Sequence, residues 1–178
     1  LAGLDIELRT TAPGTTLTLD NDVRARTTGS NLILRSANDV AISLSDRTAG
    51  YEELPAYAAL QLSSLEVVAN AGAGTIRIEP FSIDAVPADL TLETAGDQRY
   101  SGTLELGNTF VTTGRDIDFD GDVTQSGAPD AGLIVGTRGK VTFAGLIGTL
   151  ADRLDRLWVL FDPDAPDDRG DPRTPVVE

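Results

Sequence analysis

An internal repeat constrains the fold of this chain more than any other feature. Residues 110–123 (FVTTGRDIDFDGDV) align without a gap with residues 134–147 (IVGTRGKVTFAGLI), an offset of 24 residues (141 − 117). The apolar positions and one internal glycine agree, whereas the polar positions between them differ. The matched pairs are Phe110 with Ile134, Val111 with Val135, Ile117 with Val141, Phe119 with Phe143, Gly121 with Gly145 and Val123 with Ile147. Repeats of about 20 to 30 residues are typical of solenoids, in which each coil buries its apolar face only against its neighbours.

We therefore predict a parallel β-helix, or β-solenoid, with coils of about 24 residues. Equivalent inward side chains of successive coils would stack about 4.8 Å apart. The predicted core stack consists of Ile117, Phe119, Val123, Val141, Phe143 and Ile147.

Short segments of alternating hydrophobicity, rich in Thr, Val, Ile and Leu, recur along the chain and predict strands. They are residues 4–8, 16–20, 31–36, 39–45, 65–69, 75–79, 89–94, 102–107, 116–123, 132–136, 140–147 and 157–161. Gly, Asn, Asp, Pro and Ser separate them, as turns require. The pattern predicts an all-β solenoid over residues 1–161, with an insertion near 49–61. The leucine spacing in residues 149–156 indicates a short helix or a loop before the last strand.

The aspartates of RDIDFDGDV allow two interpretations. Asp116, Asp118, Asp120 and Asp122 resemble the first half of a calcium loop, with Gly121 at the sharp turn. The aligned repeat lacks all four carboxylates but keeps its apolar frame, and the acid expected at the twelfth loop position is absent. Alternate carboxylates of an extended strand also lie about 6 to 7 Å apart. We predict outward aspartates on a strand and no cofactor, with calcium as the minor alternative.

Composition excludes several classes of function. The chain has no His and no Cys, which removes the commonest general base and any thiol nucleophile. Its net charge of −14 disfavours nucleic acid and anionic membranes, and no apolar run approaches the ~20 residues of a membrane span. A carboxylate enzyme would depend on Arg115, Asp116, Asp118 and Asp120, without a second polar cluster in register. We predict a protein that is not an enzyme, binds no nucleic acid and does not insert into a membrane.

At these residues the chain resembles a known family. The segment DIDFDGDV, followed by LIVGTRGKVTFAGLIG and LDRLWV, is similar to repeats of filamentous-haemagglutinin-like surface proteins and autotransporter-type adhesins, best over residues 90–161. The resemblance implies a right-handed parallel β-helix, an extracellular or bacterial cell-surface location and a part in adhesion or surface structure. The chain departs from the family by showing no secretion domain or leader, so we expect a piece of a longer precursor.

We expect the protein to work as a rigid, acidic rod. It would self-associate into a fibre or form part of a longer surface protein, and its partner outside the cell would be a host or cell-surface glycan or protein. The alternative is a glycan-binding or glycan-cleaving β-helix, which needs an exposed aromatic groove. Trp158, the only tryptophan, lies in an apolar strand and is expected to be buried or interfacial, which favours the structural role.

The Pro- and Asp-rich segment 162–178 is predicted to be a tail or connector. Val176 and Val177 restore strand character near its end, so the segment could add to the open sheet edge at the N-terminal coil of the next subunit. A plain linker is the alternative. The tripeptide Arg169-Gly170-Asp171 matches an integrin-binding motif, but chance explains three such letters in an Asp- and Arg-rich segment.

Overall fold

The chain is described by a computed structural model, which shows residues 5–19, 30–43, 57–79, 82–83, 86–87, 90–127, 131–149, 153–161 and 176–177. Within these ranges the regular structure is β-strand, apart from one 3₁₀ turn at Asn70–Gly72. The all-β prediction is confirmed. Among the described segments, none is a helix of the length and apolarity needed to cross a membrane.

The largest sheet, here sheet I, has seven strands that all pair in parallel. In spatial order they are β1 (Asp5–Arg9), β3 (Asn31–Ser36), β6 (Ser64–Ala69), β11 (Gln98–Ser101), β14 (Ile117–Phe119), β17 (Lys140–Phe143) and β19 (Val176–Val177).

Two further parallel sheets have five strands each. Sheet II consists of β2 (Leu17–Leu19), β4 (Val40–Ile42), β7 (Thr75–Ile78), β12 (Thr103–Leu106) and β15 (Val123–Gln125). Sheet III consists of β5 (Tyr57–Leu62), β10 (Leu90–Thr94), β13 (Phe110–Gly114), β16 (Gly132–Thr137) and β18 (Arg156–Phe161). A small antiparallel pair, β8 (Ser82–Ile83) with β9 (Val86–Pro87), lies between β7 and β10 in sequence.

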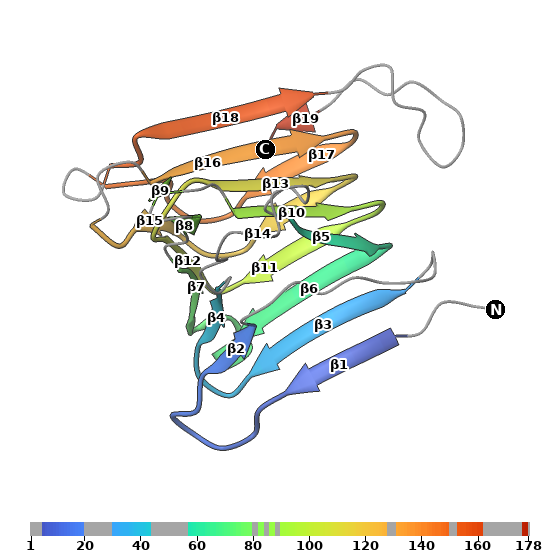
Figure 1. Ribbon diagram of the computed structural model, residues 1–178, viewed down its shortest axis with the longest axis vertical. Coiled ribbons are helices and arrows are strands. Elements are labelled where there is room, and N and C mark those ends of the chain that lie inside the picture. Colours follow the sequence, from blue (N-terminus) through green and yellow to red (C-terminus); the bar gives the residue numbers. More distant parts are fainter. Residues whose placement is uncertain are drawn as a thin grey trace.

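The chain visits these sheets in a repeating order. From β5 to β15 it passes through sheet III, then sheet I, then sheet II, three times in succession. Figure 1 shows the resulting stack, from β1 at one end to β18 at the other. Parallel strands need crossover connections, and here the strands of the other two sheets supply them.

The strand registers test the predicted repeat. Ile117 pairs with Val141 and Phe119 with Phe143, at the predicted offset. In sheet III, however, Phe110 pairs with Leu133 rather than Ile134, so the gapless alignment is wrong there by one residue. The reason is a turn of different length, because one residue more separates Thr137 from Val141 than separates Gly114 from Ile117.

Separations between hydrogen-bonded residues of neighbouring strands vary more than the repeat predicts. Asp97 and Asp116 are 19 residues apart, whereas Asp39 and Thr75 are 36 apart. The predicted insertion near 49–61 contains a strand, since β5 covers its second half and pairs with β10; residues 49–56 lie outside the described ranges. The predicted strand 116–123 is two strands in two sheets, with a turn at residues 120–122.

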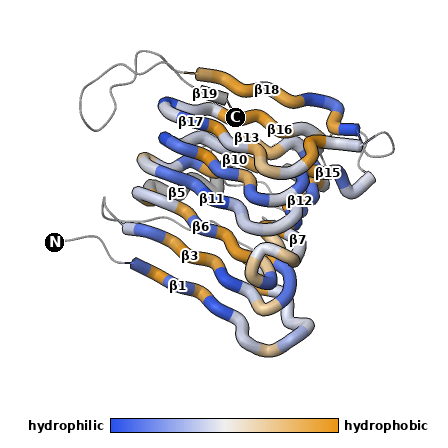
Figure 2. Tube along the Cα trace, turned by 180° about the vertical axis from the view of Figure 1, so that it is seen from behind, coloured by the Kyte–Doolittle hydropathy of each residue, from blue (hydrophilic) through white to orange (hydrophobic). Residues whose placement is uncertain are grey.

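The core lies between the three sheets and is mainly aliphatic. Burial alternates along β3, and β6 has buried residues at its second and at its last three positions. Figure 2 shows hydrophobic stretches along both strands. In β3, Leu32 and Leu34 are buried, and their register partners in β6, Leu65 and Val67, are buried as well. Side chains at equivalent positions of successive strands therefore form continuous inward columns.

One column is aromatic. Tyr100, Phe119 and Phe143 occupy the same register position in β11, β14 and β17. The Tyr100 and Phe119 rings stack with centroids 5.2 Å apart, and the Phe119 and Phe143 rings with centroids 5.0 Å apart. Offset-stacked rings at such distances stabilise a pair beyond simple burial.

A buried polar cluster interrupts the aliphatic core beside this column. Gln98 donates from Nε2 to the Thr113 carbonyl (2.7 Å) and accepts at Oε1 from the Tyr100 hydroxyl (2.6 Å). Thr112 also donates to Gln98 Oε1. Burial raises the pKa of Tyr100, so its phenol stays a hydrogen-bond donor. The cluster satisfies its own polar atoms, as a buried network must.

Candidate functional site

A column of polar residues follows the start of the strands in sheet I. Asp5, Asn31 and Ser64 are register partners. Asp97, Asp116 and Lys140 continue the column, because each directly precedes one of the register partners Gln98, Ile117 and Val141. Asn31 donates from Nδ2 to Asp5 Oδ1, and Ser64 donates from Oγ to Asn31 Oδ1, both at 2.7 Å. We call this column of residues the polar ladder.

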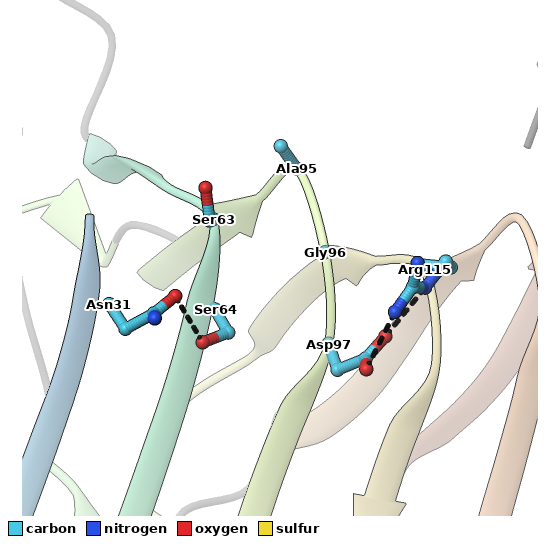
Figure 3. A pocket seen from close by; sticks show the side chains of 7 residues that line it. All are labelled: Asn31, Ser63, Ser64, Ala95, Gly96, Asp97 and Arg115. Carbon is cyan, nitrogen blue, oxygen red and sulfur yellow. Dashed lines mark hydrogen bonds and ion pairs between the residues drawn. The ribbon is translucent and has the colours of Figure 1, made fainter. Parts of the chain in front are cut away.

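An open depression of about 330 Å³ lies on the polar ladder. Its lining residues are Asn31, Ser63, Ser64, Ala95, Gly96, Asp97 and Arg115. Figure 3 shows the Asn31–Ser64 hydrogen bond on one side and the Asp97–Arg115 ion pair on the other. The depression can receive a hydrogen-bonding ligand, but four of its polar side chains already bind one another in pairs, Ser64 with Asn31 and Arg115 with Asp97.

The ion pair at this depression is bidentate. Arg115 donates from Nε and Nη2 to the two carboxylate oxygens of Asp97, at 2.8 and 2.9 Å. The hydrogen bond from Arg115 lowers the pKa of Asp97. Asp97 therefore stays ionised at neutral pH and is unsuited to donate a proton as a general acid.

Two aspartates of the RDIDFDGDV segment bind the backbone of the next repeat. Asp116 Oδ1 accepts from the Lys140 backbone N–H, and Asp122 Oδ1 accepts from the Leu146 backbone N–H, both at 2.8 Å and both 24 residues onward. Asp39 Oδ1 accepts from the Thr75 N–H (2.9 Å) in the same manner. Lys140 and Thr75 are the first residues of β17 and β7, so these carboxylates hold the N–H groups at which two strands begin, which is a structural role.

The other two aspartates lie on the outer side. Asp120 Oδ2 accepts from Arg99 Nε (2.7 Å) and from Ser101 Oγ (2.6 Å). Partial burial would raise the pKa of Asp120, but the Ser101 and Arg99 interactions outweigh it and lower that pKa. Asp118 is half-buried in β14, in register between Arg99 and Thr142. Within the described ranges, no group of three or more acidic side chains is placed to hold a metal ion, and calcium binding stays untested.

The glycine of the same segment belongs to a column of its own. Gly74, Gly102, Gly121 and Gly145 follow one another at the turn between sheets I and II. A Cβ on Gly121 would lie 2.5 Å from the Gly102 carbonyl oxygen, and one on Gly145 would lie 2.5 Å from the Gly121 carbonyl carbon. The obstacles are backbone atoms, so this turn stacks closely only without side chains.

The predicted core stack has an exposed end. Ile117, Phe119, Val123 and Val141 are buried, and Phe143 is partly buried against them. The repeat predicts Ile147 to be a core residue as well, but it is 36% exposed. It pairs with Val123 through an isolated bridge, and within the described chain no strand follows it in sheet II.

Trp158 corrects another expectation. The apolar sequence around it predicts a buried or interfacial position; 52% of it is exposed, so it is not buried in the single chain, and the interfacial position stays a prediction. Alternation along β18 places Val159 against the core and Trp158 on the outer face, where Ile134 is its register neighbour. The Arg156 guanidinium lies over the indole, 4.9 Å from the ring centroid. The alternation of side chains along residues 157–161 defines two faces of the strand, but it does not say which face is the outer one. The structure answers this, because β18 pairs with β16 and Val159 packs against the core.

The C-terminal strand pairs within its own chain. The sequence predicts that Val176 and Val177 add to an edge of the next subunit, but β19 pairs in parallel with β17, placing Val176 opposite Lys140 and Val177 opposite Val141. An open edge on the chain's own sheet I competes with any second subunit, because it is tethered and therefore at high effective concentration. Residues 162–175, with Arg169, Gly170 and Asp171, lie outside the described ranges.

Comparison with known proteins adds no relative. No protein-family model, curated protein or solved structure matches the chain.

Proposed function

We propose that the chain is a right-handed β-solenoid with coils of about 24 residues, and that it is a structural protein of the cell exterior. The observation that carries this proposal is the repeated passage through three parallel sheets, with inward columns that continue from strand to strand. Separations longer than 24 residues correspond to insertions at the turns. A stack in which each strand pairs with both neighbours is a stiff rod, and it serves adhesion or fibre formation.

The use of the carboxylates supports a role without catalysis. Asp116 and Asp122 accept backbone hydrogen bonds, while Asp97 and Asp120 bind arginines. A glycan-cleaving enzyme would instead need two carboxyl groups facing one bond of the substrate. The location outside the cell follows from the resemblance to filamentous-haemagglutinin-like repeats.

Two measurements test the proposal. Small-angle scattering of the purified full chain should give the pair-distance distribution of a rod, and antibodies against the chain should label intact cells of the source organism as strongly as permeabilised ones. A spherical particle would overturn the proposed fold, and labelling only after permeabilisation would overturn the location.

A glycan-binding role is the second candidate, and the exposed Trp158 favours it. An exposed indole on the outer face of a sheet offers the apolar surface on which a sugar ring stacks, and Arg156 beside it offers hydrogen-bond donors.

Intrinsic fluorescence reports this second candidate directly, because the chain has one tryptophan. Titration with oligosaccharides should change the emission of Trp158 if the candidate is correct. Leu160→Ala is the matched control, since Leu160 is also exposed on the outer face of β18 and its truncation leaves the indole in place. An emission spectrum that no oligosaccharide changes would rule this candidate out.

A further inference from the structure

An aliphatic column does not by itself determine which strands stack on one another. Leu65, Gln98, Ile117 and Val141 are register partners along sheet I, and all four are buried. The aliphatic members attract one another without directional bonds. A strand that shifts by two residues, or a strand from another part of the stack, would therefore present the same kind of face. Misassembly of this sort is a characteristic failure of repeat proteins.

Gln98 is the polar member of this column, and its side-chain amide uses its whole hydrogen-bonding capacity. Nε2 donates to the Thr113 carbonyl (2.7 Å) and to Thr94 Oγ1 (3.1 Å). Oε1 accepts from the Tyr100 hydroxyl (2.6 Å) and from Thr112 Oγ1. Both N–H groups and both acceptor sites of the amide are therefore occupied inside the protein.

The partners of the amide come from two successive passages of the chain through the three sheets. We call the passage from β10 to β12 the β10 coil, the passage from β13 to β15 the β13 coil, and the passage that begins at β16 the β16 coil. Gln98 and Thr94 belong to the β10 coil, whereas Thr112 and Thr113 belong to the β13 coil. The amide therefore joins its own coil to the following one through side-chain bonds as well as through the backbone ladder.

Thr112 is the position that distinguishes the β13 coil. Val135 is its register partner in β16, so a β11 strand stacked on the β16 coil would meet an aliphatic side chain there. A shift of β13 by two residues would bring Phe110 or Gly114 to the same position. In each case Gln98 Oε1 would lose a donor inside the core, and a buried polar atom without a partner is costly.

We propose that Gln98, together with Tyr100 and Thr112, determines which coil stacks on β11 and in which register. Buried polar residues fix the register of coiled coils in a comparable way, at a cost in stability. The role of the cluster lies in the assembly of the core, so it holds wherever the protein is located and goes beyond the proposed function.

An apolar replacement of the cluster tests the proposal on the full chain. The variant combines Gln98→Leu, Tyr100→Phe and Thr112→Val, which keep the approximate side-chain shapes and remove the bonded polar atoms. Replacing both partners of a buried hydrogen bond by apolar groups of the same shape is nearly neutral. Urea unfolding should therefore give about the same midpoint for this variant as for the unmodified chain.

Engineered disulfides report the stacking, and the chain contains no cysteine of its own. Arg99 and Asp118 are register partners on adjacent strands, about 5 Å apart and within reach of a disulfide. Asp120 lies two residues further along and Thr142 one strand further, at roughly 8 and 10 Å from Arg99, beyond that reach. Arg99→Cys is combined in turn with Asp118→Cys, Asp120→Cys and Thr142→Cys, and the proteins are refolded under oxidising conditions.

With the cluster intact, only the 99–118 disulfide should form. In the apolar variant, the 99–120 or the 99–142 disulfide should form in a yield comparable to that of the 99–118 disulfide. Gln98→Leu alone should give the same result, because the Tyr100 and Thr112 hydroxyls lie 3.2 Å apart and can bond each other once the amide is gone. Ile117→Leu is the matched control, since it disturbs the same column but keeps the cluster, and it should form the 99–118 disulfide alone.

Two results would overturn the proposal. If the apolar variant forms the 99–118 disulfide alone, other features of the chain fix the stacking. If the apolar variant is clearly less stable than the unmodified chain, the cluster contributes stability rather than selection. Scattering and cell labelling are measured on the unmodified chain, so either result leaves the proposed function to its own test.

Discussion

Phe119 and Phe143 stack face to face, with ring centroids 5.0 Å apart and planes 6° from parallel. Phe119 is fully enclosed because Tyr100 covers its other face, whereas Phe143 is only partly buried. Phe119→Ala should therefore lower the free energy of unfolding by about 3 to 5 kcal/mol. Urea unfolding measures the change, and Phe143→Ala should cost clearly less. Equal losses at the two positions would contradict the stacking order.

The glycine column predicts a steric effect. Gly121→Ala places a methyl group against the backbone carbonyl of Gly102 and should destabilise the fold by about 1 to 3 kcal/mol. Gly14→Ala is the control, because Gly14 has a positive φ of 76° but open space around it, and the backbone strain alone should cost about 1 kcal/mol. Thermal unfolding compares the two. A smaller loss for Gly121→Ala than for Gly14→Ala would argue against close packing at this turn.

Alanine substitutions of the aspartates in residues 115–123 should differ in their effect on stability. Asp116→Ala removes the acceptor of the Lys140 N–H and should cost about 1 kcal/mol. Asp118→Ala, two residues along the chain on the outer face, should change the stability by less than about 0.5 kcal/mol. Asp116→Asn keeps an acceptor oxygen and should recover most of the loss. Chemical unfolding of the three variants checks this, and the prediction fails if Asp118→Ala is the most damaging.

Calcium should leave the stability unchanged. Asp116 and Asp122 already accept backbone hydrogen bonds and Asp120 binds Arg99, so few carboxylate oxygens are free to surround an ion. A ligand at a hundred times its dissociation constant would stabilise the fold by about 2.7 kcal/mol. Thermal unfolding with calcium and with chelator should give the same midpoint, and a rise of many degrees with calcium would show a genuine site.

Acid should weaken the polar ladder. The pKa of Asp97 is lowered from 3.8 by its hydrogen bond with Arg115, so the folded state binds the proton less readily than the unfolded state. The stabilisation is complete above about pH 3.8 and is lost as the pH falls through the lower folded pKa. The stability difference between the unmodified chain and Asp97→Asn should shrink on acidification. A difference that is constant with pH would mean that the ion pair contributes nothing.

The strand positions and the central register could be predicted better than the surfaces. Ile117 pairs with Val141 as predicted, because β14 and β17 lie at the predicted offset of 24 residues. Phe110 pairs one residue away from the predicted partner, because a turn differs in length and the apolar pattern does not reveal turn lengths. β11 escaped prediction because Gln98 faces inward and replaces an apolar residue, which only its bonds to Thr112, Thr113 and Tyr100 explain.

At the candidate site, the outward direction of the aspartates could be predicted, but their acceptor role could not. Asp116 and Lys140 align in the repeat as unrelated outward residues, whereas the bond joins the side chain of one to the backbone of the other. Any residue type except proline offers a backbone N–H, so the identity of Lys140 does not reveal that its N–H binds Asp116. The exposure of Trp158 could not be predicted because Leu157, Val159 and Leu160 beside it are all apolar, as in a buried strand.

The separation of hydrogen-bonded neighbours varies from 19 to 36 residues while the strands stay in register. The extra residues lie between strands in the sequence, and the paired strands keep their register whatever the length of the connection. A longer or shorter connection therefore leaves the pairing of the strands on either side of it unchanged. The number of stacked strands therefore sets the length of the stack, independently of how long each connection is.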